Sequence, residues 1–111
     1  MNKFLDEKFN QSQTFKPQDE KERLLVKAFA SLKNEEEIGN FLRDLLTSKE
    51  LKEFANRIEI ARLLSEGKSY LKISKEVGVS TTTVTRVAYW LFSGCGGYYK
   101  VIQKLTKKIK A

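Results

Sequence analysis

Apolar residues recur at helical spacing along most of the chain. From Gln18 onward, an apolar stripe repeats at i, i+1, i+4, i+5 and i+8 through Leu32, which is the period of an amphipathic helix. Asn34, followed by three glutamates, is typical of a helix start, because an amide side chain caps the first turn and acids favour the positive end of the helix dipole. A second apolar stripe then runs to Leu46. These patterns predict two helices.

A third helix is predicted to carry two apolar faces. Thr47 and Glu50 have the spacing of a capping box, so the helix should begin there and end near Gly67. One apolar stripe consists of Leu51, Phe54, Ala55, Ile58, Ala61 and Leu64, and a second consists of Ile60 and Leu63. Two apolar faces need two neighbours, more than a small monomer readily supplies. A partner chain is therefore expected to complete the core.

Residues 69–92 have the pattern of a helix-turn-helix motif. Ser69 and Ser80 are each placed to cap a helix, and Gly78 can reverse the chain between the two helices. Ser74 supplies a small residue where the helices approach most closely. The apolar residues where they meet are Ile73 and Val77 from the first helix and Val84 and Val87 from the second, and Val79 follows the glycine as an apolar plug.

The remaining segments complete an all-α prediction. Three glycines within residues 94–97 interrupt the helical pattern, and an apolar stripe over residues 98–109 predicts a last helix. Residues 1–17 are polar and aperiodic, which predicts a flexible N-terminal arm. The expected fold is all-α, with about six helices in one domain over residues 18–111.

Positive charge is concentrated in the C-terminal part of the chain. The formal net charge is +7, and residues 67–111 hold nine basic residues against one acid, Glu76. This asymmetry indicates an anionic partner, and double-stranded DNA is favoured over a membrane surface. A solvated basic face is the alternative that charge alone leaves open.

The second helix of the motif carries the candidate base contacts. When its valines face inward, helical geometry turns the threonines and Arg86 outward or toward the N-terminal tip. Recognition helices present such residues to base edges, while lysines on the preceding helix contact phosphates. A run of Ser and Thr that only caps a helix is the alternative. The candidate DNA-binding residues are Lys72, Lys75, Ser80, Thr81, Thr82, Thr83, Thr85 and Arg86.

The stretch LLTSKELKEFANRIEIARLLSEGKSYLKISKEVGVSTTTVTRV resembles the Trp repressor family, and most closely its YerC/YecD-type members. The resemblance covers about residues 20–105. It implies an intertwined homodimer in which each subunit presents one helix-turn-helix to an inverted-repeat operator. The implied function is that of a transcriptional repressor. The two recognition helices of such a dimer lie about 34 Å apart, one turn of B-DNA.

The same resemblance implies an effector pocket, because L-tryptophan acts as corepressor beside the recognition helix in the Trp repressor. Matched onto this sequence, the pocket is built from Thr47, Arg57 and Arg86. Two positions depart from the family: Val87 replaces a glycine, and Trp90 replaces a serine that meets the ligand's amino group. We expect Trp90 or its neighbours to occupy the effector space. The motif would then act without L-tryptophan or answer to another small effector; the alternative is that Trp90 is a core or dimer-interface aromatic.

Composition argues against an enzyme. With no His and one Cys, the chain has no imidazole base, no Cys–His pair and no zinc-ligand spacing. No secretory signal, transmembrane span or disulfide framework is predicted, so a cytoplasmic protein is expected. An interaction module that binds protein or nucleic acid nonspecifically stays open, as does redox sensing through Cys95. Four lysines of the last helix are further candidate DNA contacts: Lys104, Lys107, Lys108 and Lys110.

Overall fold

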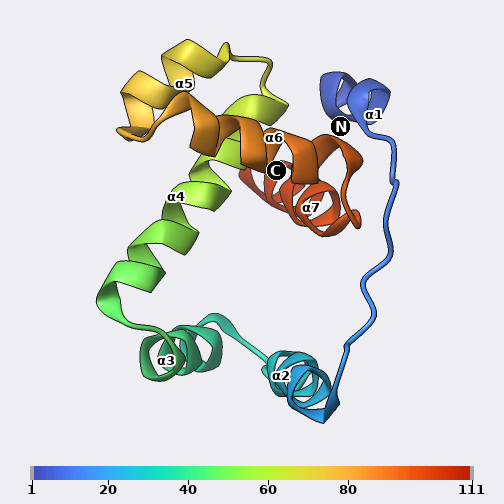
Figure 1. The fold of residues 1–111 in the computed structure, drawn as a ribbon, viewed down its shortest axis with the longest axis vertical. Coiled ribbons are helices and arrows are strands. Elements are labelled where there is room, and N and C mark those ends of the chain that lie inside the picture. The colour runs from blue at the N-terminus through green and yellow to red at the C-terminus, as the bar shows by residue number, and fades with distance from the viewer. Residues whose placement is uncertain (1, 111) are drawn as a thin grey trace. The chain divides into compact units, whose positions relative to one another are not determined.

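The computed structural model describes the backbone of residues 2–110 and the side chains of residues 2–106. The described residues form α-helices and no strand, as the all-α prediction requires. Figure 1 shows their order along the chain. The helices are α1 (Lys3–Lys8), α2 (Glu20–Ala30), α3 (Glu35–Leu45), α4 (Ser48–Ser65), α5 (Tyr70–Val77), α6 (Thr81–Ser93) and α7 (Gly97–Lys110).

The chain divides into two compact units, and the division falls inside α4. One unit, here called the α2/α3 unit, spans Phe15–Phe54. The other, here called the helix-turn-helix unit, joins the residues up to Thr14 to those from Ala55 onward. The N-terminal segment therefore belongs with the helix-turn-helix, although more than forty residues separate them in sequence.

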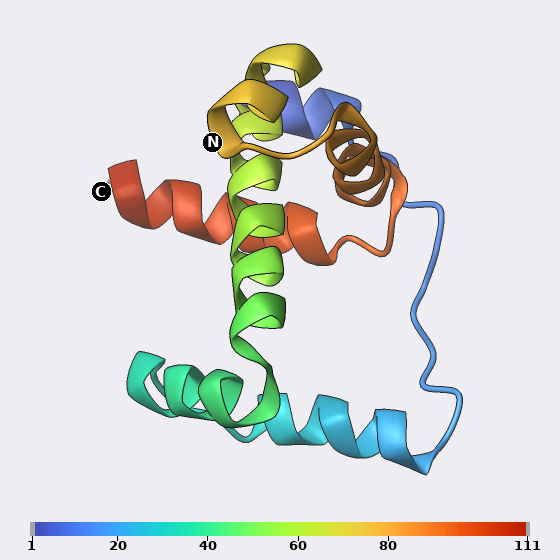
Figure 2. The same cartoon turned by 60° about the vertical axis from the view of Figure 1, so that its left-hand side comes forward.

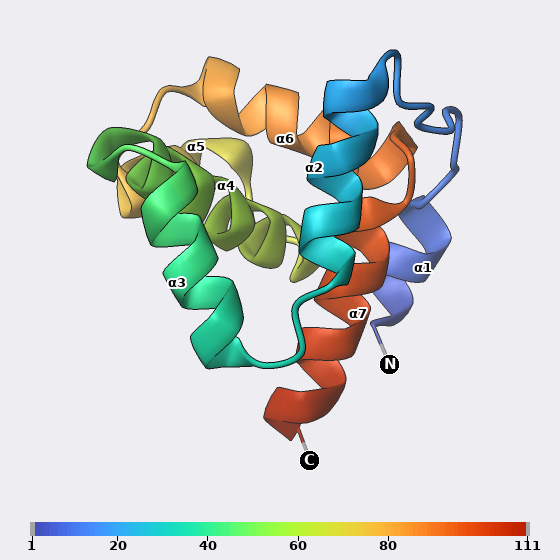
Figure 3. The same ribbon diagram turned by 90° about the horizontal axis from the view of Figure 1, so that it is seen from below.

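Within the α2/α3 unit, two amphipathic helices leave their apolar side chains open to solvent. Neither α2 nor α3 contains a buried residue. The rings of Phe29 and Phe41 meet edge to face with centroids 5.2 Å apart, and Figure 3 shows the short loop that joins the two helices. An apolar cavity of about 290 Å³ is lined by Lys21, Leu24, Leu25, Ala28, Phe41 and Leu45. This unit does not bury its own apolar face.

The predicted helix starts in this unit are confirmed. The Asn34 side chain accepts a hydrogen bond from the Glu37 N–H at the start of α3. At the start of α4, the Glu50 carboxylate accepts from the Thr47 N–H at 2.9 Å, and the Thr47 hydroxyl accepts from the Glu50 N–H at 3.1 Å. Hydrogen bonding of the Glu50 carboxylate to the Thr47 backbone, and secondly to its side chain, lowers the pKa of Glu50, because it stabilises the ionised form. The capping box thus acts as the sequence predicts.

In the helix-turn-helix unit, the second half of α4 lies at the centre of the core. Ile60, Ala61, Leu63 and Leu64 are buried there. They pack with buried residues of α5, α6 and α7, and α6 contacts both α5 and α7. Figure 2 shows α7 crossing close to this half of α4. Both predicted stripes of the third helix contribute to this core, whereas Phe54 and Ile58 stay exposed.

The structure differs from the flexible arm predicted over residues 1–17. Residues 3–8 form α1, whose first turn is capped by the Asn2 side chain, and Leu5 on that helix is fully buried. A helix of this length is unstable alone and depends on tertiary packing. Its apolar residues show no repeating stripe, so periodicity does not reveal it.

Candidate nucleic-acid interface and adjoining cavity

The turn between α5 and α6 is built as the motif predicts. Gly78 ends α5 with φ of 82°, a left-handed conformation that favours glycine. The N–H groups of Gly78 and Val79 donate to the Ser74 carbonyl at 2.9 and 3.1 Å. The Ser74 hydroxyl donates back to the Val79 carbonyl. Ser74 therefore ties the turn in addition to allowing the close approach of the helices.

The inward face of α6 is the apolar ridge that the sequence predicts. Val84, Val87 and Leu91 are buried, and they pack in one cluster with the buried Ile73 of α5. Burial of several aliphatic side chains at this contact contributes about 1.5 to 3 kcal/mol for each. The ridge fixes which residues of α6 face solvent.

The N-terminal tip of α6 exposes the residues predicted to face DNA. Ser80 caps the helix, its hydroxyl accepting from the Thr83 N–H at 3.2 Å. Thr81 and Thr82 are exposed beside it. Thr85 is also exposed, and its hydroxyl donates to the Thr81 carbonyl at 2.9 Å. Thr82 therefore keeps its hydroxyl available at the tip, whereas the hydroxyl proton of Thr85 is used within the helix.

The basic candidates lie on the surface of the same unit. Lys72 and Lys75 are exposed on α5, and Arg86 is exposed on α6. Among the lysines of the last helix, Lys104 is exposed. The side chains of Lys107, Lys108 and Lys110 lie outside the described residues.

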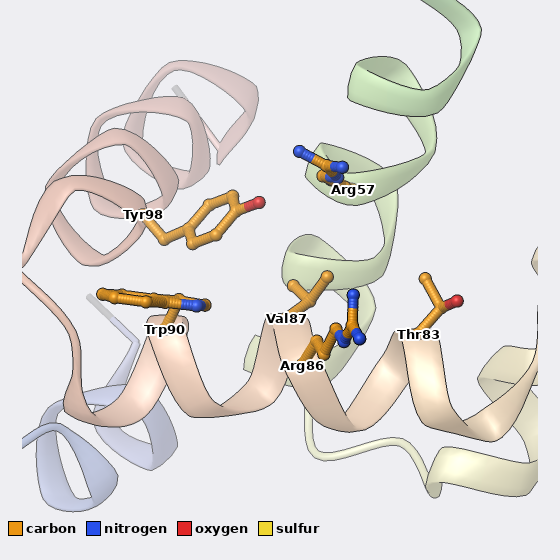
Figure 4. A pocket seen from close by; sticks show the side chains of 6 residues that line it. All are labelled: Arg57, Thr83, Arg86, Val87, Trp90 and Tyr98. Atoms are coloured by element: carbon orange, nitrogen blue, oxygen red, sulfur yellow. The ribbon is translucent and has the colours of Figure 1, made fainter. Parts of the chain in front are cut away.

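Thr83 differs from its neighbours, because it faces a cavity rather than the exposed tip. It is half-buried, and its hydroxyl lies 3.1 Å from the hydroxyl of Ser80. The cavity, of about 380 Å³, is lined by Arg57, Thr83, Arg86, Val87, Trp90 and Tyr98. Figure 4 shows Arg57 on α4, Tyr98 on α7 and the other four residues on α6. The cavity thus borders α6 from Thr83 to Trp90.

The electrostatics of the cavity favour an anionic or polar occupant. Two arginines, Arg57 and Arg86, contribute to its lining. Tyr98 is half-buried, and desolvation raises the pKa of its hydroxyl, while the charge of Arg57 opposes that rise. Tyr98 consequently stays a neutral hydrogen-bonding group near neutral pH.

Trp90 forms part of the cavity lining. The residue is 45% exposed, and its indole meets the Tyr89 ring edge to face at a centroid distance of 5.2 Å. Figure 4 shows the rings of Trp90 and Tyr98 at the same end of the cavity. Val87 projects its side chain into the middle of the lining. The two positions at which the resemblance implies different residues, Val87 and Trp90, thus both lie in the cavity wall.

Of the predicted effector residues, the structure brings together Arg57, Arg86 and Trp90. Thr47 belongs to the α2/α3 unit, where it caps α4. Sequence reasoning missed Tyr98, because it follows the glycine turn and no spacing links it to α6. It also placed Thr83 only at the DNA-facing tip.

Other candidate chemistry is limited in the described part of the chain. Cys95 is a free, half-buried thiol in the turn before α7. Among residues 2–106, no group of His, Cys, Asp and Glu side chains is arranged to hold a metal ion. None of the described helices combines the length and the apolar character needed to cross a bilayer.

Comparison with known proteins places the chain in one family. The family profile described as Trp repressor protein matches residues 20–106. The Bacillus subtilis protein YerC, itself uncharacterized, is 40% identical over 81 residues, which cover 73% of this chain and 78% of YerC. A solved structure of a TrpR-like protein from Eubacterium eligens superimposes with a TM-score of 0.73 at 34% identity, covering 80% of this chain and 92% of that one.

A second solved structure, from Staphylococcus aureus, matches with a TM-score of 0.69 at 31% identity. It covers 76% of this chain and 84% of that chain. The residues matched by the family profile include the helix-turn-helix and much of the chain before it.

Proposed function

The chain belongs to the Trp repressor family, and from this premise we propose that it is a transcriptional repressor that binds an inverted-repeat operator as a homodimer. The family consists of DNA-binding regulators rather than enzymes. The observation that carries the proposal is the capped tip of α6, where Thr81 and Thr82 stand exposed above a buried valine ridge. Such a tip is the part of a recognition helix that enters the major groove.

The charge distribution supports DNA as the partner. Residues 67–111 have nine basic residues and one acid, a net charge of +8 against +7 for the whole chain. Exposed lysines on α5 precede the tip of α6 in sequence and lie on the same unit. Phosphate contacts by Lys72 and Lys75 would set the register of the protein on the duplex, while threonines on α6 read base edges.

The α2/α3 unit supports the homodimer. It buries none of the side chains of α2 and α3, and it exposes large apolar residues around its cavity. Contiguous exposed apolar surface of this kind marks a protein interface. Two-fold symmetry would pair two recognition helices and so specify an inverted-repeat site.

A Thr82→Ala variant tests base reading. We expect the free-energy difference between operator and scrambled duplex to fall by about 1 to 3 kcal/mol, because an exposed hydroxyl and methyl group are lost from the tip. Competition gel shifts over a range of salt concentrations measure this difference.

Lys72→Ala is the matched control on the preceding helix. It should weaken binding to both duplexes alike and reduce the salt slope by about 1. Equal affinity of the unsubstituted chain for both duplexes would instead make the protein a nonspecific interaction module.

DNA binding is further proposed to proceed without L-tryptophan. Val87 and Trp90 both line the cavity. The resemblance to the Trp repressor implies a glycine at the first position and, at the second, a serine that meets the ligand's amino group. Calorimetry with L-tryptophan should therefore give no saturable heat at micromolar concentrations. A V87G/W90S variant, which restores both family residues, should bind L-tryptophan better than the unsubstituted chain. Micromolar binding by the unsubstituted chain would contradict the proposal.

A further inference from the structure

The N-terminal segment is anchored to the helix-turn-helix unit at its first turn. The Asn2 amide donates to the Ser65 carbonyl at 2.8 Å, at the end of α4. Leu5 is fully buried within the core of that unit. The rings of Phe4 and Phe92 meet edge to face at 6.4 Å. The segment thus contacts both α4 and α6.

The following residues bond to the C-terminal end of the recognition helix. The backbone N–H groups of Ser12 and Gln13 donate to the Gly94 carbonyl at 3.3 and 3.4 Å. The Gln13 amide donates to the Tyr89 hydroxyl at 2.7 Å. Both acceptors adjoin Trp90: the Tyr89 ring packs against its indole, and Gly94 lies against its ring and carbonyl.

The same segment also holds the start of α7. The Asp6 carboxylate accepts from the Tyr99 hydroxyl at 2.5 Å and from the Gln103 amide. Phe9 stacks on Tyr99 with ring centroids 4.0 Å apart. The preceding residue, Tyr98, lines the cavity. Two helices that line the cavity, α6 and α7, are therefore both held by contacts to the same N-terminal segment.

We propose that residues 2–13, here called the N-terminal strap, position the recognition helix for DNA, with Asp6 and Gln13 as the positioning residues. This proposal rests on the proposed function. The strap fixes Gly94 and Tyr89 at one end of α6, while Thr82 stands at the other end. The strap therefore restrains α6, the helix that borders the cavity, by contacts within the same chain.

The restraint reaches the tip because α6 is one continuous helix. It has 13 residues, and at 1.5 Å per residue it is about 20 Å long. A small rotation at the end held by the strap therefore displaces the DNA-facing end. Loss of the strap contacts increases the population of other α6 orientations. The affinity for DNA then falls in proportion to the fraction of molecules that keep the binding-competent orientation.

A D6A/Q13A double variant of the full chain tests the strap. Operator affinity should fall about tenfold, within the usual range of coupling between two sites. The emission of Trp90, the one tryptophan of the chain, should shift to the red as its wall of the cavity loosens. Neither Asp6 nor Gln13 contributes a buried apolar group, so circular dichroism and thermal melting should show that the double variant is folded.

Glu7→Ala is the matched control. It removes the same charge from the same helix at an exposed position, and it should leave affinity and emission unchanged. The single variant Asp6→Asn keeps an acceptor oxygen for Tyr99 and Gln103. It should therefore lose much less operator affinity than the single variant Asp6→Ala. Gln13→Ala alone should shift the Trp90 emission, even in a protein with unaltered melting.

The strap proposal is overturned by a folded double variant with unchanged affinity and emission, or by an equal loss in Glu7→Ala. A chain that does not discriminate operator DNA at all would refute the proposed function separately. In that case the Trp90 emission of the same variants still decides whether the strap positions α6.

Discussion

A Leu24→Asp variant should be monomeric at concentrations at which the unsubstituted chain is a dimer. Leu24 is 67% exposed in the single chain, so the substitution removes little packing there. In the proposed dimer the same position would be covered by the partner. Burying a carboxylate in an apolar interface costs several kcal/mol, so the dissociation constant should rise about a hundredfold or more. Sedimentation velocity over a dilution series measures the change.

Lys27→Asp is the control for this experiment, since it also introduces an aspartate into α2, at an exposed position that does not line the apolar cavity. It should keep the dimer. A Leu24→Asp protein that stays dimeric would place the interface elsewhere, and an unsubstituted chain that is monomeric would refute the homodimer.

A Gly94→Ala variant should lose on the order of 3 kcal/mol of stability. An added Cβ would lie 2.4 Å from the Trp90 carbonyl oxygen and 2.8 Å from Cε3 of the Trp90 ring. The carbonyl belongs to the last turn of α6 and accepts from the Gly94 N–H at 3.1 Å, so backbone must move to make room. Urea denaturation followed by Trp90 fluorescence measures the loss.

Gly97→Ala is the matched control in the same turn. A Cβ there would meet nothing within 4 Å, and alanine is a better helix former than glycine at the start of α7. Its stability should stay within about 1 kcal/mol of the unsubstituted chain. Equal stability of the two variants would contradict the packing of Gly94 against Trp90.

The helix-turn-helix could be predicted from sequence because its determinants are local. The caps at Ser69 and Ser80 act within four residues of chain, and both are confirmed. The αL turn at Gly78 is likewise a property of one residue. The period of the valines fixed which face of α6 is buried, and the structure confirms it.

The strap and the full cavity lining could not be predicted, because they depend on contacts distant in sequence. Leu5 belongs to a cluster whose other buried members follow it by more than fifty positions. Tyr98 reaches the cavity from α7, across a glycine turn that breaks helical periodicity. Thr83 is the same residue type as Thr81 and Thr82, so the sequence does not distinguish them. The orientation of α6 in the fold decides that Thr82 is exposed and Thr83 half-buried.

Selection of bound sequences from a random duplex library, with and without L-tryptophan, is the most direct test of the proposed operator recognition. A dimer that reads DNA through the tip of α6 should enrich an inverted repeat whose half-sites are centred about 10 base pairs apart. The same repeat should be enriched in both conditions. Enrichment of no sequence would contradict sequence-specific DNA binding. Enrichment of a repeat only when L-tryptophan is present would contradict binding without that effector.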